Sequence, residues 1–295
     1  MVKSKDQKKL HEPDQDDSII KHPLDDLLRT DRIPHIWCPG CGIGTAFSSC
    51  LHAMRGSGLD LEKTVMVSGI GCSGRGAGYV KLDSYHTTHG RAIPFATGMK
   101  LANPELNVVV FSGDGDLFAI GGNHFIHAAR RNMALTVVCV NNFTYGMTGG
   151  QAAATTPYLA KTTTTPKGNH ESPFNLPLLA YASGATLIAR WTILHARDLT
   201  ECLKQALQHS GFSFIEILSP CPVNYGRRNR QSALDMLKMF QDKCIIQNGA
   251  SPAELEMDFA KRIVLGKFIH VQRPTCIETY DKTCRLTDFS KGKAA

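Results

Sequence analysis

The sequence has few aromatic residues and no long hydrophobic run. Phe, Trp and Tyr make up 7% of 295 residues, and no Lys/Arg run is interleaved with aromatics, which disfavours a nucleic-acid-binding surface. Apolar runs such as residues 137–140 are far shorter than the roughly eighteen residues that a membrane helix needs. The first eighteen residues are charged and lack the apolar segment of a secretory signal. We therefore expect a soluble, cytoplasmic protein with no membrane or nucleic-acid partner.

Cysteine and positive charge are both abundant. Ten cysteines are too many for a disulfide framework in a reducing cytosol, so we expect some of them to bind a metal or a cluster. The 33 Lys and Arg residues outnumber the 26 Asp and Glu residues, giving a net charge of +7. This excess favours an acidic protein partner or an anionic substrate. Hydrophobic residues at 42% permit a sizeable core, in one large domain or two small ones.

From residue 64 onwards, short β-branched runs alternate with amphipathic segments. The runs at 64–70, 107–112, 135–140, 185–190 and 212–219 are typical of strands, and the segments at 45–54, 91–103, 117–131, 176–182 and 198–210 are typical of helices. Asp198 is the expected N-cap of the last helix and Gly211 its expected C-cap. The alternation predicts an α/β fold with a doubly wound, mostly parallel sheet.

The pattern also divides the chain. Residues 1–29 are expected to form a polar, irregular extension, residues 30–230 the domain, and residues 231–295 a tail that packs on the domain or on a partner. Within the tail we expect a helix at 232–243 and a strand at 262–269.

Four unusual stretches follow four of the expected strands. They are GCSGRGAG after residue 70, GDGD after 112, NNFTYGMTGGQ after 140 and PCPVNYG after 219. Ligands of open α/β sheets bind outside the carboxyl ends of the strands. We therefore expect all four stretches to meet on one rim and to form the functional site there.

The GDGD and NN stretches have the chemistry of a magnesium–diphosphate site. Asp114 offers a carboxylate oxygen and Asn142 an amide oxygen, and both are ligands that Mg²⁺ accepts alongside phosphate and water. Gly113 and Gly115 let the backbone approach a phosphate, and the helix that begins near Asp116 presents free N–H groups to it. The alternative is a plain turn followed by a strand-end cap, but the context at two strand ends favours the metal site.

Four cysteines form a candidate metal or cluster site. Cys38 and Cys41 form a CxxC in a Gly/Pro loop, Cys72 lies in the turn after residue 70, and Cys221 ends a strand. Four thiolates bind either zinc or a [4Fe–4S] cluster, and the spacing does not separate the two. A redox dithiol is disfavoured because no strand precedes the CxxC. The other cysteines are Cys50, Cys139 and Cys202, expected in the core, and Cys244, Cys276 and Cys284, any of which is an alternative to Cys221.

Six motifs occur in the order found in β subunits of 2-oxoacid:ferredoxin oxidoreductases. They are WCPGCG, GIGCSGR, HTTHGRAIPFATGMK, GDGD, NNFTYGMTGGQ and PCPVNYG. The chain resembles this family over about residues 30–230 and is most similar to its 2-oxoglutarate branch. The resemblance implies the pyrophosphate-domain type of thiamine diphosphate-binding α/β fold. It also implies CoA-dependent oxidative decarboxylation of 2-oxoglutarate to succinyl-CoA and CO₂ with reduction of ferredoxin, and the reverse carboxylation.

The resemblance implies three cofactors: thiamine diphosphate, Mg²⁺ and one [4Fe–4S] cluster. Asp114, the Asn142 side chain and the Thr144 carbonyl would bind Mg²⁺, and Cys38, Cys41, Cys72 and Cys221 would hold the cluster. The residues implied along the rest of the cofactor are Cys72, His89, Gly113, Gly115, Asp116, Gly146, Met147 and Thr148. Met147 equally suits a purely packing role.

Two further residues are candidates for catalysis. His89 would hydrogen-bond the diphosphate by family analogy, whereas the residues alone fit an HxxH metal site with His86 or two ordinary loop histidines. Arg75 suits the distal carboxylate of 2-oxoglutarate, because a guanidinium grips a carboxylate with two parallel hydrogen bonds. An ordinary ion pair is the alternative for Arg75.

We expect the chain to provide only about half of the active site. Thiamine enzymes activate their cofactor with a glutamate from a second, related αβ unit, and we find no second unit of that length here. The resemblance thus implies an α subunit, with or without a fused γ domain, in a heterodimer of heterodimers. Ferredoxin would dock near the cluster, where Arg227, Arg228 and Arg230 are candidate contacts.

Three other functions remain as alternatives. Pyruvate could replace 2-oxoglutarate as the substrate, although Arg75 disfavours it. A non-redox thiamine-dependent decarboxylase or carboligase would not need the four cysteines. A non-catalytic metal-binding or electron-carrier module would not need the GDGD and NN motifs.

Overall fold

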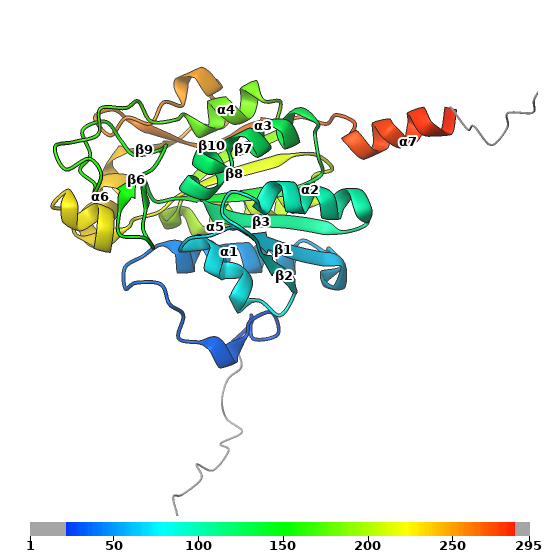
Figure 1. Ribbon diagram of the computed structural model, residues 1–295, viewed down its shortest axis with the longest axis horizontal. Helices are drawn as coiled ribbons and strands as arrows, with labels where there is room; N and C mark the ends of the chain where they lie inside the picture. Colours follow the sequence, from blue (N-terminus) through cyan, green and yellow to red (C-terminus); the bar gives the residue numbers. More distant parts are fainter. Residues whose placement is uncertain (1–21, 287–295) are drawn as a thin grey trace, which may run out of the picture.

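The computed structural model describes residues 22–286 of the chain. Its main element is an eight-stranded sheet in the order β2-β1-β3-β4-β8-β7-β10-β9, seen nearly edge-on in Figure 1. The strands of this sheet are β1 (Thr64–Ser68), β2 (Asp83–His86), β3 (Asn107–Gly113), β4 (Thr136–Asn141), β7 (Leu187–Thr192), β8 (Ser213–Leu218), β9 (Cys244–Ile246) and β10 (Ile263–His270). All neighbouring strands run parallel except β10, which pairs antiparallel with β7.

The central strands are buried on both faces. Every residue of β1, β4, β7 and β8 is buried, and these strands are rich in Val, Ile and Thr. Such continuous apolar runs are typical of parallel strands that have helices on both sides. The separate β5 (Thr144–Tyr145) and β6 (Gln151–Ala152) form a small antiparallel hairpin in the loop after β4.

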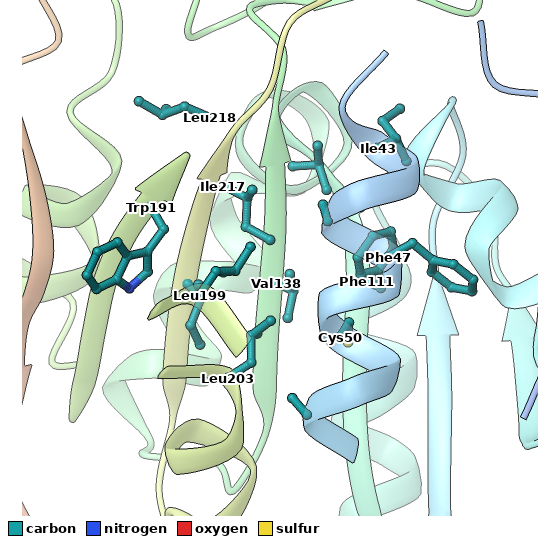
Figure 2. Packing of buried hydrophobic residues seen from close by; sticks show 14 of the residues in the cluster. Ile43, Phe47, Cys50, Phe111, Val138, Trp191, Leu199, Leu203, Ile217 and Leu218 are labelled. Carbon is teal, nitrogen blue, oxygen red and sulfur yellow. The ribbon is translucent and has the colours of Figure 1, made fainter. Parts of the chain in front are cut away.

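Helices cover both faces of the sheet. They are α1 (Ile43–Gly56), α2 (Ala92–Ala102), α3 (Gly122–Arg130), α4 (Leu176–Ala182), α5 (Ala196–Gln208) and α6 (Ala233–Lys243), whereas α7 (Cys276–Leu286) projects away from the sheet (Figure 1). One core packs α1 and α5 against the sheet, with Phe47, Leu203 and Val138 among its members (Figure 2). The other core packs α2, α3 and α4 against the opposite face, around Phe125 and Phe214. The predicted doubly wound, mostly parallel α/β fold is therefore confirmed.

The two caps predicted for the helix α5 differ from those in the structure. Asp198 lies in the first turn of α5 and does not cap it. The helix starts earlier because the Thr192 hydroxyl caps a 3₁₀ turn (Ile193–His195) that runs directly into α5. At the other end His209, and not Gly211, is the C-cap, and its side chain is buried. Both predicted caps of this helix were wrong.

Segments near both ends of the described chain pack against the domain or pair with its sheet. Most of the predicted extension, residues 1–21, lies outside the described residues, but Leu24 and Leu27 are buried in the α1–α5 core and Leu28 bridges to Val80. In the tail the expected helix and strand are present as α6 and β10, and β10 lies within the sheet. The proposed domain boundaries remain predictions. Within residues 22–286 no helix is long and apolar enough to cross a membrane.

Candidate functional site

The carboxyl ends of β1, β3, β4 and β8 converge on two adjoining cavities. The first, which we call the Asp114 cavity, has a volume of about 160 Å³. Its walls include all the residues predicted along the cofactor: Cys72, His89, Gly113, Asp114, Gly115, Asp116, Asn142, Thr144, Gly146, Met147 and Thr148. The second, which we call the cysteine cavity, has a volume of about 230 Å³ and adds the loop after β8. The predicted meeting of four strand-end loops on one rim is present.

Asp114 is a buried carboxylate at the base of its cavity. It is 2% exposed and begins a π-helical turn (Gly115–Ile120) directly after β3. Burial raises the pKa of Asp114 to about 6, although the Thr155 hydroxyl and nearby backbone N–H groups, including that of Asn142, favour the charged form. A carboxylate in this position is favourable only with a cation nearby. Asn142 is also buried and lines the same cavity. This pair of oxygen donors therefore fits Mg²⁺.

Asp116 has a different role from Asp114. Its Oδ1 accepts hydrogen bonds from the backbone N–H of Ile70 at 3.0 Å and of Gly90 at 2.7 Å, and contacts His89 Nδ1 at 2.8 Å. Its Oδ2 accepts from the Ser112 hydroxyl at 2.9 Å. The carboxylate thus joins the loops after β1 and β2 to the end of β3. With Nδ1–H donating to Asp116, the Nε2 of His89 is the ring nitrogen left for a ligand.

Two glycines near these carboxylates are required by close packing. A Cβ at Gly69 would lie 1.9 Å from Asp116 Oδ2, and one at Gly115 would lie 2.3 Å from the Tyr145 ring. Neither position has room for a larger residue. Tyr145 also donates from its hydroxyl to the Gly115 carbonyl at 3.4 Å, so its ring forms one wall of the Asp114 cavity.

The four predicted cysteines all line the cysteine cavity. Cys38 is exposed, Cys41 and Cys72 are half-buried, and Cys221 is 8% exposed. The Cys41 N–H donates to the Cys38 carbonyl at 3.0 Å, closing the CxxC into a turn. Trp37 Nε1 donates to the Cys72 carbonyl at 2.7 Å and fastens this turn to the loop after β1. Cys221, from the loop after β8, lines the same cavity, so residues far apart in the sequence meet there.

The four thiols are close enough to affect each other electrostatically. Burial, together with the neighbouring Cys221, Cys41 and Cys38, raises the pKa of Cys72 to about 12. Burial likewise raises the pKa of Cys41 to about 11. A Cβ at Gly146 would lie 3.5 Å from Cys72 Sγ and 3.6 Å from Cys221 Sγ, so this glycine borders both sulfurs. Within residues 22–286, however, no three His, Cys, Asp or Glu side chains are grouped tightly enough to hold a single ion.

The remaining cysteines lie elsewhere. Cys50, Cys139 and Cys202 are buried in the core, as expected. Cys244 is in β9 and Cys276 in α7, and neither lines the cysteine cavity. The side chain of Cys284 lies outside the described residues.

The two cavities share a wall. Cys72, Asn142, Gly146 and Met147 line both of them. A group held by the thiols would therefore lie next to a ligand held at Asp114.

Comparisons with known proteins agree with this geometry. Residues 69–217 match the family described as thiamine pyrophosphate enzyme, C-terminal TPP binding domain. The 2-oxoglutarate synthase subunit KorB of Methanothermobacter marburgensis is 47% identical over 280 residues, covering 94% of this chain and 96% of that protein. The KorB subunit of Methanocaldococcus jannaschii is 48% identical over 262 residues, covering 88% and 97%. The chain belongs to the KorB family.

A solved structure supports the same relationship. The 2-oxoglutarate:ferredoxin oxidoreductase from Magnetococcus marinus, with 2-oxoglutarate, coenzyme A and succinyl-CoA bound, matches with a TM-score of 0.80 and 33% sequence identity. The match covers 89% of this chain and 90% of that chain. Membership of the KorB family establishes an oxidoreductase subunit with a thiamine diphosphate-binding domain, and the motif-based resemblance is confirmed.

Two predicted residues of this KorB-family site differ in their placement. Met147 is 46% exposed and lines both cavities. Arg75 is exposed and lines neither; it borders a separate hollow beside β2. Its assignment to the distal carboxylate of 2-oxoglutarate therefore remains a prediction.

Sequence reasoning missed some residues of the site. Tyr145 and Asn224 lie within quoted motifs, and Asn224 Nδ2 donates to the Gly146 carbonyl at 2.6 Å. Thr155, which donates to Asp114, lies in the loop after β6 and had no sequence signal. Its role depends on how that loop folds back over β3.

Proposed function

We propose that this chain is the β subunit of a 2-oxoglutarate:ferredoxin oxidoreductase. The complex would convert 2-oxoglutarate and coenzyme A to succinyl-CoA and CO₂ while reducing ferredoxin, and would catalyse the reverse reductive carboxylation. The observation that carries the proposal is the wall shared by the Asp114 cavity and the cysteine cavity. A non-redox thiamine enzyme does not need four thiols at this position.

The Asp114 cavity fits thiamine diphosphate with Mg²⁺. Asp114, the Asn142 side chain and the Thr144 carbonyl would bind the metal, since all three residues line the cavity and provide oxygen donors. Thiamine diphosphate, when bound, supplies the nucleophilic carbon and the electron sink for decarboxylation. The chain's own contribution is to position the diphosphate: Gly113 and Gly115 allow close approach, and His89 Nε2 is available for a phosphate oxygen.

The same cavity contains the other residues proposed for the cofactor. Gly146, Met147 and Thr148, from the loop after β4, would lie along its length. We also propose that Asp116 acts through the loops that it joins, because its carboxylate oxygens already accept from four groups of the chain.

The cysteine cavity fits a [4Fe–4S] cluster better than zinc. A zinc site needs thiolates about 2.3 Å from one ion, whereas no tight single-ion group exists within the described residues. Cys38, Cys41, Cys72 and Cys221 instead surround a cavity of about 230 Å³. A cluster there would accept electrons one at a time, and Cys72 would connect it to the thiamine cavity. The exposure of Cys38 would leave one side near the surface for a ferredoxin.

The site would be completed by an α subunit. We propose that it provides the glutamate that activates thiamine, in a heterodimer of heterodimers. Exposed apolar residues beside the two cavities support a protein contact here: Ile36 is 62% exposed, Ile70 41% and Met147 46%.

The decisive experiment is elemental analysis of the complex, purified without oxygen after co-expression with the α subunit. We expect about four irons and four sulfides per β subunit. Cys221→Ser should lose them, whereas the matched control Cys202→Ser, a buried cysteine of α5, should keep them. One zinc without sulfide would contradict the redox function. Activity with pyruvate but not with 2-oxoglutarate would contradict the substrate assignment.

A further inference from the structure

A network of buried polar side chains crosses three adjacent strands of the sheet, β7, β8 and β4. Arg190 of β7 donates from Nε to Glu216 Oε2 of β8 at 2.6 Å, and Glu216 Oε1 accepts from Asn141 Nδ2, at the end of β4, at 2.7 Å. All three residues are buried, and we call them the β7–β4 network. None of them lines the Asp114 cavity or the cysteine cavity. The network is therefore outside the groups that would touch the cofactors.

The network ends at the turn that contains two of the proposed metal ligands. Asn141 Oδ1 accepts from the Phe143 N–H at 3.1 Å. Phe143 has a φ of 66°, a left-handed conformation that is costly for a bulky residue and persists only where the surroundings fix it. Asn142 and Thr144 flank Phe143, and both line the Asp114 cavity. The conformation of Phe143 thus sets the direction of the backbone between these two ligands.

The hydrogen bonds of the network run in one direction, because arginine cannot accept a hydrogen bond. A guanidinium has only donors, and an ionised carboxylate has only acceptors. Glu216 therefore requires the NH₂ group of Asn141, and the Asn141 oxygen is left to face the Phe143 N–H. The charged pair thus determines which side of the Asn141 amide faces the turn.

Stability of the fold does not by itself account for the charged pair. Apolar side chains of similar size are often as stable as a buried ion pair, because burying two charges is costly. The contact that apolar residues would not provide is the acceptor for Asn141 Nδ2. The pair therefore has a consequence for the turn after β4 that is separate from its consequence for stability.

We propose that Arg190 and Glu216 are positioning residues for the Mg²⁺ site and act on it through Asn141, an inference that rests on the function proposed above. They hold the turn from Asn142 to Thr144 in one form in the absence of the metal. Hydrogen-bond partners that orient a metal ligand commonly change the metal affinity by about ten- to a hundredfold. The network should therefore affect metal binding without touching the metal.

Glu216→Gln should reverse the direction of the network. The oxygen of the new amide faces Arg190, which can only donate, so the NH₂ group of the new amide faces Asn141. The Asn141 oxygen then turns toward that NH₂ group, and the Phe143 N–H loses its acceptor. Adding Arg190→Met removes the competing donor, so the glutamine oxygen can accept from Asn141 Nδ2 again. A second substitution should thereby rescue the first.

The test measures Mn²⁺ binding in the presence of thiamine diphosphate. The complex is co-expressed with the α subunit, purified without oxygen and freed of divalent metal, and free Mn²⁺ is followed by electron paramagnetic resonance. We expect the dissociation constant for Mn²⁺ to rise about tenfold or more in Glu216→Gln, and to return to within about twofold of wild type when Arg190→Met is added. Equal dissociation constants in wild type and Glu216→Gln would overturn the proposal.

A matched control separates positioning from a loss of stability. Leu203→Ala removes a buried side chain of α5 that belongs to neither cavity and destabilises the core by creating a hole there. It should lower the midpoint of thermal unfolding of the complex and leave the Mn²⁺ dissociation constant unchanged. If Leu203→Ala weakened Mn²⁺ binding as much as Glu216→Gln does, the network would have only a structural role.

A second pair of variants keeps the test valid if Glu216→Gln alone does not fold. Arg190→Met with Glu216→Leu removes the same charges as Arg190→Met with Glu216→Gln, but it leaves Asn141 Nδ2 without an acceptor. We expect the leucine variant to bind Mn²⁺ more weakly than the glutamine variant, because its Asn141 amide is no longer held. Equal affinities of these two double variants would refute the role of the network.

The same measurement separates this proposal from the proposed function. Failure of wild type to bind Mn²⁺ with thiamine diphosphate would refute the proposed function. Tight binding by wild type together with unchanged binding in every network variant would refute the positioning role and leave the proposed function valid.

Discussion

Replacing Glu216 with glutamine should destabilise the fold strongly, because it leaves a buried arginine without its counter-charge. Arg190 in β7 is 0% exposed and Glu216 in β8 is 1% exposed, and Arg190 Nε donates to Glu216 Oε2 at 2.6 Å. Arg190 Nη1 donates to the Leu255 carbonyl at 3.1 Å, and Nη2 is buried with no partner among the described residues. Removing one partner of a buried ion pair costs about 3–5 kcal/mol.

The change removes the negative charge and one of the two oxygen acceptors. The second oxygen of Glu216 accepts from Asn141 Nδ2 at 2.7 Å, and glutamine keeps one oxygen acceptor at this position. Urea denaturation followed by circular dichroism should therefore give a free energy of unfolding about 3–5 kcal/mol below that of wild type.

A double variant provides the control. Arg190→Met with Glu216→Leu removes both charges and replaces them with apolar side chains, which is often neutral for stability. We expect it to recover most of the loss. A loss below about 1 kcal/mol in Glu216→Gln, or a double variant less stable than the single one, would refute the reasoning.

Three further predictions follow from the site. Burial raises the pKa of Asp114 from 3.8 to about 6, so between these pH values the folded metal-free chain binds a proton that the unfolded chain does not. The free energy of unfolding of wild type should therefore rise relative to that of Asp114→Asn as the pH falls from about 6 to about 4. A difference between the two proteins that stays constant over this range in urea denaturation would contradict the prediction. Iodoacetamide should label exposed Cys38 of the cluster-free chain before Cys41 and Cys72, because burial raises the pKa of those two thiols; equal rates by mass spectrometry would disprove it. Reversing the exposed Arg227, Arg228 and Arg230 to glutamate should raise the KM for ferredoxin about tenfold at low salt and less at high salt, and an unchanged KM would end the docking hypothesis.

The sequence predicted the fold because local and long-range signals agreed. Strands such as β1 and β4 are rich in β-branched residues and are buried on both faces, so the same residues that favour a strand also define the parallel core. The GDGD and NN stretches follow such strands directly. Their meeting at one rim follows from strand direction alone, and Asp114 and Asn142 accordingly line one cavity.

The sequence did not predict features that depend on tertiary contacts. The place of β10 between β7 and β9 depends on how the tail folds back, which no local pattern encodes. Arg75 follows Cys72 by three residues, but the 3₁₀ turn (Ser73–Tyr79) carries it away from both cavities to the separate hollow beside β2. Thr155 reaches Asp114 only because the loop after β6 folds over β3.

The two carboxylates of GDGD illustrate how packing gives identical groups different chemistry. Asp116 accepts from four hydrogen-bond partners in the loops after β1 and β2 and at the end of β3, so its lone pairs are occupied and it orders the backbone and His89. Among the described residues, Asp114 has a single side-chain donor, Thr155, and its other stabilising contacts are backbone N–H groups. Its pKa is nevertheless raised, which means that burial outweighs those contacts. The raised pKa marks Asp114 as the carboxylate that a nearby cation would stabilise, which is what a metal ligand at this position requires.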